Sequence, residues 1–338
     1  MNHFAYSRAA DVADAVRQIA ADGNARFIAG GTNLIDLMKE DVIRPSRLID
    51  ISRLPLHRIE ETRDGGLRIG ALVANTDVAY FPEVEQRYPL LASAILAGAS
   101  PQLRNMASTG GNLLQRTRCY YFYDTATPCN KRQPGSGCAA IAGQNRIHAV
   151  LGTSERCIAT HPSDMCVALA ALGATVVAIG RDGERRIPFA DFHRLPGDTP
   201  ERDTNLGADE IVTAIELPPQ GFARNSSYLK IRDRLSYAFA LVSAAVGLEL
   251  ADGRIVAAAI ALGGVAHKPW RVPEAEAELR GKPASPATFA RAADRLLHGA
   301  RGFGHNDFKI ALARRVVTRA LTQAAQGTPQ SQSDKRIA

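Results

Sequence analysis

The 338-residue sequence lacks the features that define several common classes of protein. It has no long apolar run, since its most apolar stretch, residues 165–180, is broken by Gly173 well short of a bilayer span. Its first residues carry charge and contain no apolar segment of the kind found in secretory signal peptides. We therefore expect a soluble chain with no membrane helix and no signal peptide of its own.

A clustered basic surface is also missing. The net charge is +7, from 41 Lys and Arg against 34 Asp and Glu, but the basic residues are spread from Arg8 to Lys335. Nucleic-acid binding requires a basic stripe or a recognisable module, and the sequence shows neither. An acidic partner protein or an anionic ligand would account for the excess charge, and a surface rich in arginine would account for it more simply.

Cysteine is scarce, with five residues in the whole chain. Without a signal peptide, this number argues against a disulfide scaffold and for thiols that act as ligands or as small buried side chains. Four of them fall in one short part of the chain with the spacing C-x9-C-x8-C-x18-C, at Cys119, Cys129, Cys138 and Cys157. The fifth, Cys166, is expected on a helix and in the core.

The long gaps between these cysteines differ from the short CxxC spacing of zinc ribbons and bacterial ferredoxins. They suit a loop that wraps a larger object, because the prolines and glycines of residues 128–137 supply the necessary turns. Three interpretations remain open on the residues alone: free buried thiols, a structural zinc site, and a [4Fe-4S] cluster.

The order of the predicted elements indicates an α+β fold. Residues 26–52 read as strand, helix and strand, a βαβ unit with parallel strands, and the helix begins at Thr32 or Asn33. Strands are expected from Ile59 to Thr76, with a hairpin at residues 63–66. The remaining elements before residue 218 are helices at 11–21, 88–99 and 163–172, then a strand at 174–180 and a hairpin at 181–186.

A domain boundary is expected at residues 218–227. Beyond it, three antiparallel strands and two helices form a second domain, residues 225–325, in which a sheet packs against a helical layer. The tail, residues 326–338, shows no apolar periodicity and is expected to be disordered.

Two glycine pairs stand at positions suited to binding a phosphate. Gly30-Gly31 lies between a predicted strand and helix, where glycine lets a ligand approach bare backbone N–H groups at a helix N-terminus. Gly110-Gly111, in STGGNLLQ, repeats the arrangement, although neither pair fits GxGxxG or a P-loop. Each pair alone is more often a plain tight turn, but the two together could hold both phosphates of one pyrophosphate.

A third candidate is the sequence HPSDM at residues 161–165. Ser163 stands at the N-cap of the helix that follows, and Asp164 lies in its first turn. Capping explains Ser163 without any ligand. The alternative is that Asp164 binds a ribose hydroxyl.

These motifs, with KIRDRLSYAFA at 230–240 and LGGVAHKPWR at 262–271, resemble the FAD-binding medium subunits of the xanthine oxidase family of molybdenum hydroxylases. The resemblance covers nearly the whole chain. The cysteine-bearing insert also matches the flavoprotein subunit of heterotrimeric periplasmic aldehyde oxidoreductases, whereas most medium subunits lack it.

The resemblance implies a flavin domain of the vanillyl-alcohol-oxidase type at residues 1–220, followed by a C-terminal domain of the CO dehydrogenase flavoprotein type. The flavin domain would have subdomains at 1–55 and 56–220, with an iron–sulfur insert at 116–157. FAD would lie between the subdomains. The residues implied to bind it are Ala29, Gly30, Gly31, Thr32, Asn33, Leu34, Thr109, Gly110, Gly111, Asn112, Ser163, Asp164, Lys230, Ser236 and Tyr237.

Two of these residues would lie near the isoalloxazine ring: Lys230, which would stabilise the anionic reduced flavin, and Tyr237, a possible stacking partner. Without the resemblance, Ser236–Ala238 would read as a β-hairpin with a buried tyrosine. The resemblance also favours iron over zinc, because the matched insert carries a [4Fe-4S] cluster on four cysteines.

The implied function is electron transfer. A partner with molybdenum cofactor would oxidise an aldehyde, a small [2Fe-2S] subunit would pass electrons on, and FAD here would deliver them to an external acceptor. The complex would reach the periplasm on a partner's twin-arginine signal; alone, the chain would stay in the cytoplasm. The alternatives are a self-contained flavin oxidase or reductase and a zinc-bearing structural subunit. The sequence identifies neither the aldehyde nor the acceptor.

Overall fold

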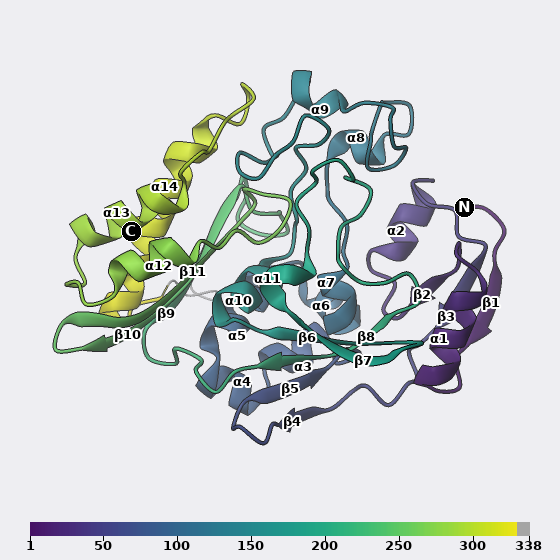
Figure 1. Cartoon of the computed structure of the whole chain (residues 1–338), viewed down its shortest axis with the longest axis horizontal. Coiled ribbons are helices and arrows are strands. Elements are labelled where there is room, and N and C mark those ends of the chain that lie inside the picture. Colours follow the sequence, from purple (N-terminus) through teal and green to yellow (C-terminus); the bar gives the residue numbers. More distant parts are fainter. Residues whose placement is uncertain (330–338) are drawn as a thin grey trace.

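The computed structural model describes residues 1–329, which form three β-sheets with helices packed on them (Figure 1). The predicted α+β class is therefore confirmed. The predicted disordered tail lies outside the described residues from residue 330 onward, and Gln326 is still the last residue of a helix.

The first sheet is parallel, with the order β1-β3-β2. Its elements are β1 (Ala5–Arg8), α1 (Val12–Ala21), β2 (Arg26–Ile28), α2 (Leu34–Lys39) and β3 (Arg47–Asp50). The predicted βαβ unit is confirmed, and α2 follows an N-cap at Asn33. The sequence reading missed β1, because this strand is largely exposed and has no apolar face. It is held by pairing with β3.

The second sheet is antiparallel, with the order β4-β5-β8-β6-β7. Its strands are β4 (Ile59–Glu61), β5 (Leu67–Gly70), β6 (Thr175–Gly180), β7 (Gly183–Pro188) and β8 (Ile211–Leu217). Both predicted hairpins are confirmed. The central strand β8 was not predicted: all seven of its residues are buried, so it lacks the alternation that marks a half-exposed strand.

The prediction of strands through Thr76 is wrong at its end, because the chain turns into α3 (Asn75–Ala79). The remaining helices before β8 are α4 (Pro82–Arg87), α5 (Pro89–Ala97), α6 (Pro101–Met106), α7 (Thr109–Leu113), α8 (Tyr120–Tyr123), α9 (Ala139–Ala142), α10 (Asp164–Leu172) and α11 (Phe189–Phe192). Of these, α8 and α9 lie in the cysteine insert, away from this sheet (Figure 1). Every residue of α10 is buried, and Gly173 ends it in the left-handed conformation.

The C-terminal sheet is antiparallel, with the order β11-β10-β9. It consists of β9 (Ser226–Ile231), β10 (Val242–Ala251) and β11 (Arg254–Gly263), followed by α12 (Pro273–Leu279), α13 (Pro286–Leu296) and α14 (Phe308–Gln326). The three strands and the two longer helices were predicted, whereas the short α12 was not. Asp252 and Gly253 both have positive φ, as a two-residue hairpin turn requires.

Candidate functional site

The two glycine motifs lie against each other. A Cβ on Gly30 would stand 1.7 Å from the carbonyl oxygen of Met106, so only glycine lets the first motif approach the segment that leads into the second. Gly31 has φ +71, a left-handed conformation that other residues rarely adopt. The first motif is therefore a loop held close to the second.

The second motif is not the tight turn that its glycine pair indicated. Gly110 and Gly111 lie in the first turn of α7, because Ser108 caps this helix and accepts a hydrogen bond from the Gly111 N–H (3.2 Å). Gly110 packs closely on Ala71, whose Cβ would be 3.0 Å from an added side-chain carbon. The role of these residues in phosphate binding stays a prediction.

The second and third motifs are joined by side-chain hydrogen bonds. Ser163 caps α10 by accepting from the Cys166 N–H, as predicted, and its hydroxyl also donates to Asn112 Oδ1 (2.5 Å). Asn112 in turn donates to Asn75 Oδ1 (2.6 Å). A cap alone needs none of these further bonds, so Ser163 also fixes Asn112 of the second motif.

Asp164 is the centre of a buried polar group that reaches the C-terminal sheet. Its carboxylate accepts a hydrogen bond from Tyr228 Oη (2.5 Å) and pairs with Lys230 Nζ (2.8 Å). Lys230 also donates to the Ala97 carbonyl (3.1 Å). Burial, followed by the nearby Asp164 carboxylate, raises the pKa of Tyr228 well above its usual value, so the phenol keeps its proton. The predicted sites Asp164 and Lys230 are thus in direct contact.

A cavity of about 330 Å³ lies beside Asp164, within the size range of ligand pockets. Its walls come from the third motif (His161, Ser163 and Asp164), from the loop between β9 and β10, and from the start of the cysteine insert (Arg118 and Tyr120). The glycine motifs do not line this cavity.

Tyr237 lies on the β9–β10 loop but does not line the cavity. The expected hairpin is present, because β9 and β10 pair as antiparallel neighbours, but the expectation of a buried tyrosine is wrong: Tyr237 is 56% exposed and its φ is +52. Ala238 and Phe239 line the cavity instead. Phe239 was not predicted as a site residue, although its position in the same SYAFA motif as Tyr237 could have indicated it. The roles of Ser236 and Tyr237 toward the flavin stay predictions.

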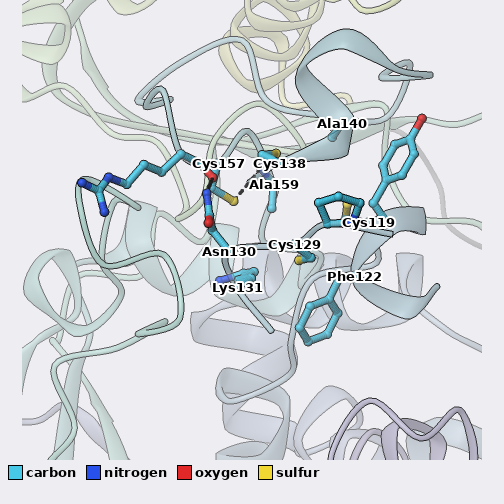
Figure 2. A pocket seen from close by; sticks show the side chains of 12 residues that line it. Cys119, Phe122, Cys129, Asn130, Lys131, Cys138, Ala140, Cys157 and Ala159 are labelled. Atoms are coloured by element: carbon cyan, nitrogen blue, oxygen red, sulfur yellow. Dashed lines mark hydrogen bonds between the residues drawn. The ribbon is translucent and has the colours of Figure 1, made fainter. Parts of the chain in front are cut away.

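The four cysteines singled out by their proximity in sequence line one small pocket (Figure 2). Cys129 and Cys138 lie on facing segments joined by a backbone bridge, Cys119 precedes α8, and Cys157 lies at the end of the insert. Cys166 lies on α10 and does not line this pocket, in agreement with its prediction as a core residue.

Burial disfavours the thiolate forms of Cys119, Cys138 and Cys157 in the cysteine pocket. Burial raises the pKa of Cys119 to about 12 and that of Cys157 to about 11. Since a bound cation deprotonates a coordinating thiol, these cysteines become thiolates only with a metal present. The four cysteines of the lining offer sulfur donors, the ligand type that both structural zinc sites and iron–sulfur clusters use.

One side of the cysteine pocket is anchored to α2. Its apolar side contains Leu37 and Val42, which belong to α2 and the turn after it. Arg118 and Tyr123 both donate to Asp36 of α2, each at 2.8 Å. The pocket therefore packs on the helix that follows the first glycine motif.

Charged residues close the other side of the cysteine pocket. Lys131 is buried; its ammonium donates to the Pro200 carbonyl (2.7 Å) and pairs with Asp203, which also binds Arg116 Nε (2.6 Å). Burial of Asp203 opposes its ionisation, but Lys131 and Arg116 outweigh this effect and hold its pKa well below the usual range. The charge of Lys131 is therefore largely balanced.

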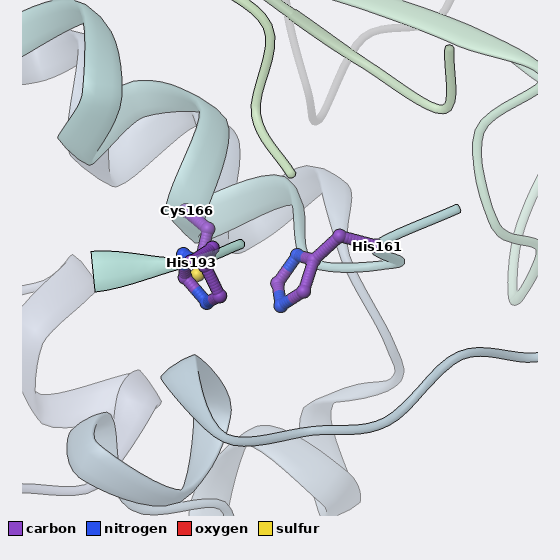
Figure 3. A group of neighbouring side chains, drawn as sticks. All are labelled: His161, Cys166 and His193. Carbon is purple, nitrogen blue, oxygen red and sulfur yellow. The ribbon is translucent and has the colours of Figure 1, made fainter. Parts of the chain in front are cut away.

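A second group with metal-binding side chains, His161, Cys166 and His193, lies near the third motif, with one nitrogen or sulfur atom of each within 4.8 Å of the others (Figure 3). His193 Nε2 bonds the Leu113 carbonyl at 2.9 Å, and His161 Nε2 lies 3.4 Å from the same oxygen. Burial lowers the pKa of His193 to about 4 and that of His161 well below its usual value. We interpret the pair as neutral imidazoles that hold the end of α7.

Two family models together match most of the chain. Residues 2–220 match the FAD-binding domain in molybdopterin dehydrogenase, and residues 227–324 match the CO dehydrogenase flavoprotein C-terminal domain. The chain therefore belongs to the FAD-binding medium subunits of the xanthine oxidase family of molybdenum hydroxylases. The predicted family and oxidoreductase class are confirmed, and the first match supports FAD as cofactor.

Among similar proteins, the aldehyde oxidoreductase FAD-binding subunit PaoB of Escherichia coli (strain K12) is 50% identical over 325 residues, which is 96% of this chain and 99% of PaoB. The glyceraldehyde dehydrogenase medium chain of Sulfolobus acidocaldarius is 30% identical, with 82% of each chain covered. The solved carbon monoxide dehydrogenase of Hydrogenophaga pseudoflava matches with a TM-score of 0.76 at 27% identity, covering 96% of this chain and 98% of that chain.

None of the described helices is both long enough and apolar enough to cross a membrane.

We expect the stability of the chain to fall as the pH drops from about 6.5 to 4, in part because His193 is buried as a neutral ring. The unfolded chain takes up a proton near pH 6.5, whereas the folded chain does so only near pH 4. His193→Gln removes this titration and keeps a donor toward Leu113. The variant should lose about 3 kcal/mol less than the wild type between pH 7 and pH 4. Urea unfolding at both pH values measures this difference, and equal losses would contradict it.

Proposed function

We propose that this chain is the FAD-binding electron-transfer subunit of a molybdenum-dependent aldehyde oxidoreductase, and that it passes electrons from a [2Fe-2S] subunit to an external acceptor. The observation that carries the proposal is the 50% identity, over nearly the full length of both chains, to a protein named as the FAD-binding subunit of an aldehyde oxidoreductase. The cavity beside Asp164 supports it, because the third motif lines this cavity and Ser163 of that motif is hydrogen-bonded to Asn112 of the second motif.

Bound FAD would supply the redox chemistry, while the protein supplies position and electrostatics. The residues proposed to hold it are those of the two glycine motifs, with Ser163 and Asp164 of the third. Gly30 lets the first motif pack against the Met106 carbonyl, and Ser163 fixes Asn112 of the second motif. Each of these groups is held by the fold before a ligand arrives.

Lys230 would act on the flavin less strongly than a free ammonium. It pairs with Asp164 at 2.8 Å, and both side chains are buried, so the two charges largely cancel when seen from the cavity. We propose that Lys230 mainly holds the Asp164 carboxylate in its orientation, and that its stabilisation of an anionic flavin is a smaller effect.

We also propose that Cys119, Cys129, Cys138 and Cys157 hold a [4Fe-4S] cluster. Four cysteine sulfurs that line one pocket, three of them from buried residues, are a donor set that such a cluster takes, and the lining holds no carboxylate or imidazole. Zinc would accept the same four sulfurs. The resemblance of the insert to cluster-bearing aldehyde oxidoreductase subunits is the reason to favour iron.

Metal analysis of the purified chain and its Cys129→Ser variant tests the cluster. We expect about four irons per chain and a broad brown absorption in the wild type, and loss of both in the variant. Cys166→Ala is the matched control, because this buried cysteine lies outside the pocket and should leave the iron content unchanged. Zinc in place of iron would contradict the proposal. An unchanged rate of flavin reduction by aldehyde in intact Cys129→Ser complex would show that the cluster is not on the electron path.

The FAD site is tested with Asp164→Asn. The substitution removes a charged hydrogen-bond acceptor, and a hydrogen bond to such a group contributes about 1.5–3 kcal/mol. We therefore expect the affinity for FAD to fall by roughly ten- to a hundredfold. Asp233→Asn is the control, since Asp233 also lines the cavity but is exposed and pairs with Arg146. Flavin content after gel filtration and titration of the apoprotein with FAD give the result, with circular dichroism to confirm folding. Equal affinity in wild type and Asp164→Asn would exclude Asp164 from the site.

The proposed partners are a large molybdenum-cofactor subunit and a small [2Fe-2S] subunit in a heterotrimer, and the proposed location is the periplasm, reached by export with a partner. We expect the three chains to copurify, and expect this chain to move to the cytoplasmic fraction when the partner's export signal is deleted. Aldehyde turnover by the purified single chain would favour the alternative of a self-contained flavin enzyme. A colourless chain would favour the zinc-bearing structural subunit.

A further inference from the structure

His148 makes a direct contact with a cysteine of the pocket. Its Nε2 atom lies 3.0 Å from Cys119 Sγ, and both side chains are buried. We propose that His148 donates a hydrogen bond to this sulfur and thereby raises the reduction potential of the group that the four cysteines hold. The inference rests on the proposed [4Fe-4S] centre.

The position of His148 is fixed by its backbone. Its carbonyl accepts hydrogen bonds from Lys309 Nζ (2.8 Å) and Asn306 Nδ2 (3.3 Å), and its N–H donates to the Asn145 carbonyl (2.9 Å). Lys309 and Asn306 stand at the start of α14, so the C-terminal domain holds this residue in place. The ring has little freedom to move away from the sulfur.

The surroundings of the ring select its tautomer. Nδ1 is buried and has no hydrogen-bond partner among the described residues. A proton there would be an unpaired buried donor, which costs about 1–3 kcal/mol, whereas a proton on Nε2 faces the sulfur. The neutral ring therefore carries its proton on Nε2, and a metal-bound thiolate at Cys119 is the acceptor.

Such a bond withdraws negative charge from the sulfur. It stabilises the reduced centre, which carries one more electron, more than the oxidised centre, so the reduction potential rises. Two charged residues line the pocket, and both are already paired: Lys131 with Asp203, and Arg156 with Asp198. Cys157 Sγ receives only a long bond from the Ala159 N–H (3.4 Å). His148 is thus the neutral side-chain donor aimed at the centre.

The test compares three substitutions in the full complex. His148→Leu and His148→Met remove the donor, and His148→Gln keeps an N–H at a similar reach. A redox titration followed by electron paramagnetic resonance gives the midpoint potential of the centre, with iron and FAD contents measured on each sample. At the wild-type midpoint we expect the ratio of reduced to oxidised centre to fall about tenfold in the Leu and Met variants, a shift of about 59 mV for one electron. The Gln variant should stay near the wild type.

Each other outcome overturns the inference. A wild-type potential in Leu and Met variants with full iron shows that the bond does not tune the centre, and so does a Gln variant that shifts as far as Leu. If only Gln retains iron, His148 serves cluster retention instead of potential. Absence of iron in the wild type rejects the proposed centre itself, which the iron analysis reveals before any titration.

Discussion

The buried ion pair between Asp164 and Lys230 is the interaction on which the arrangement of the site depends. It joins the first turn of α10 to β9 of the C-terminal sheet, and Tyr228 on the same strand binds the second carboxylate oxygen. Removing one partner of a buried pair costs about 3–5 kcal/mol, because the other charge is left without compensation. Since Ser163 next to it fixes Asn112, the pair also constrains the second glycine motif.

The cysteine pocket is built into the flavin domain and is not an appendage to it. Leu37 of α2 belongs to the apolar cluster that contains the pocket cysteines. On the charged side of the pocket, Asp203 pairs with Arg116 as well as with Lys131. Arg116 also donates its backbone N–H to Asn33, in the first glycine motif (2.9 Å). Whatever fills the pocket therefore supports the loop proposed to bind FAD.

Periodicity and turn signals in the sequence predicted the elements that form between residues close to one another in the chain. The βαβ unit, both hairpins and the C-terminal sheet belong to this class. β1 and β8 were missed because one is exposed on nearly all positions and the other is buried on all, so neither alternates. The second glycine pair was also misread, because a glycine pair alone indicates a tight turn. In the structure Ser108 caps a helix that contains both glycines.

The residues of the site likewise divide into those that the sequence indicated and those that it did not. The cysteines were found by their proximity in sequence, although their long gaps could not show that the fold brings them around one pocket. His148 and His193 carried no signal, because their partners Cys119 and Leu113 are 29 and 80 residues away. Phe239 instead of Tyr237 lines the cavity because the loop places Tyr237 at positive φ and turns its ring to solvent.

The cavity and the cysteine pocket share two short segments of chain. Arg118 and Tyr120 line the cavity while Cys119 between them lines the pocket, and Ile147 lines the cavity while His148 contacts Cys119. Neighbouring residues thus face two different sites, so a backbone shift in either segment reaches both. A substitution in the cysteine pocket that alters flavin behaviour is consequently not proof of electron transfer between the sites. The reduction rate must be read together with FAD content, because a displaced Tyr120 or Ile147 would change the cavity wall directly.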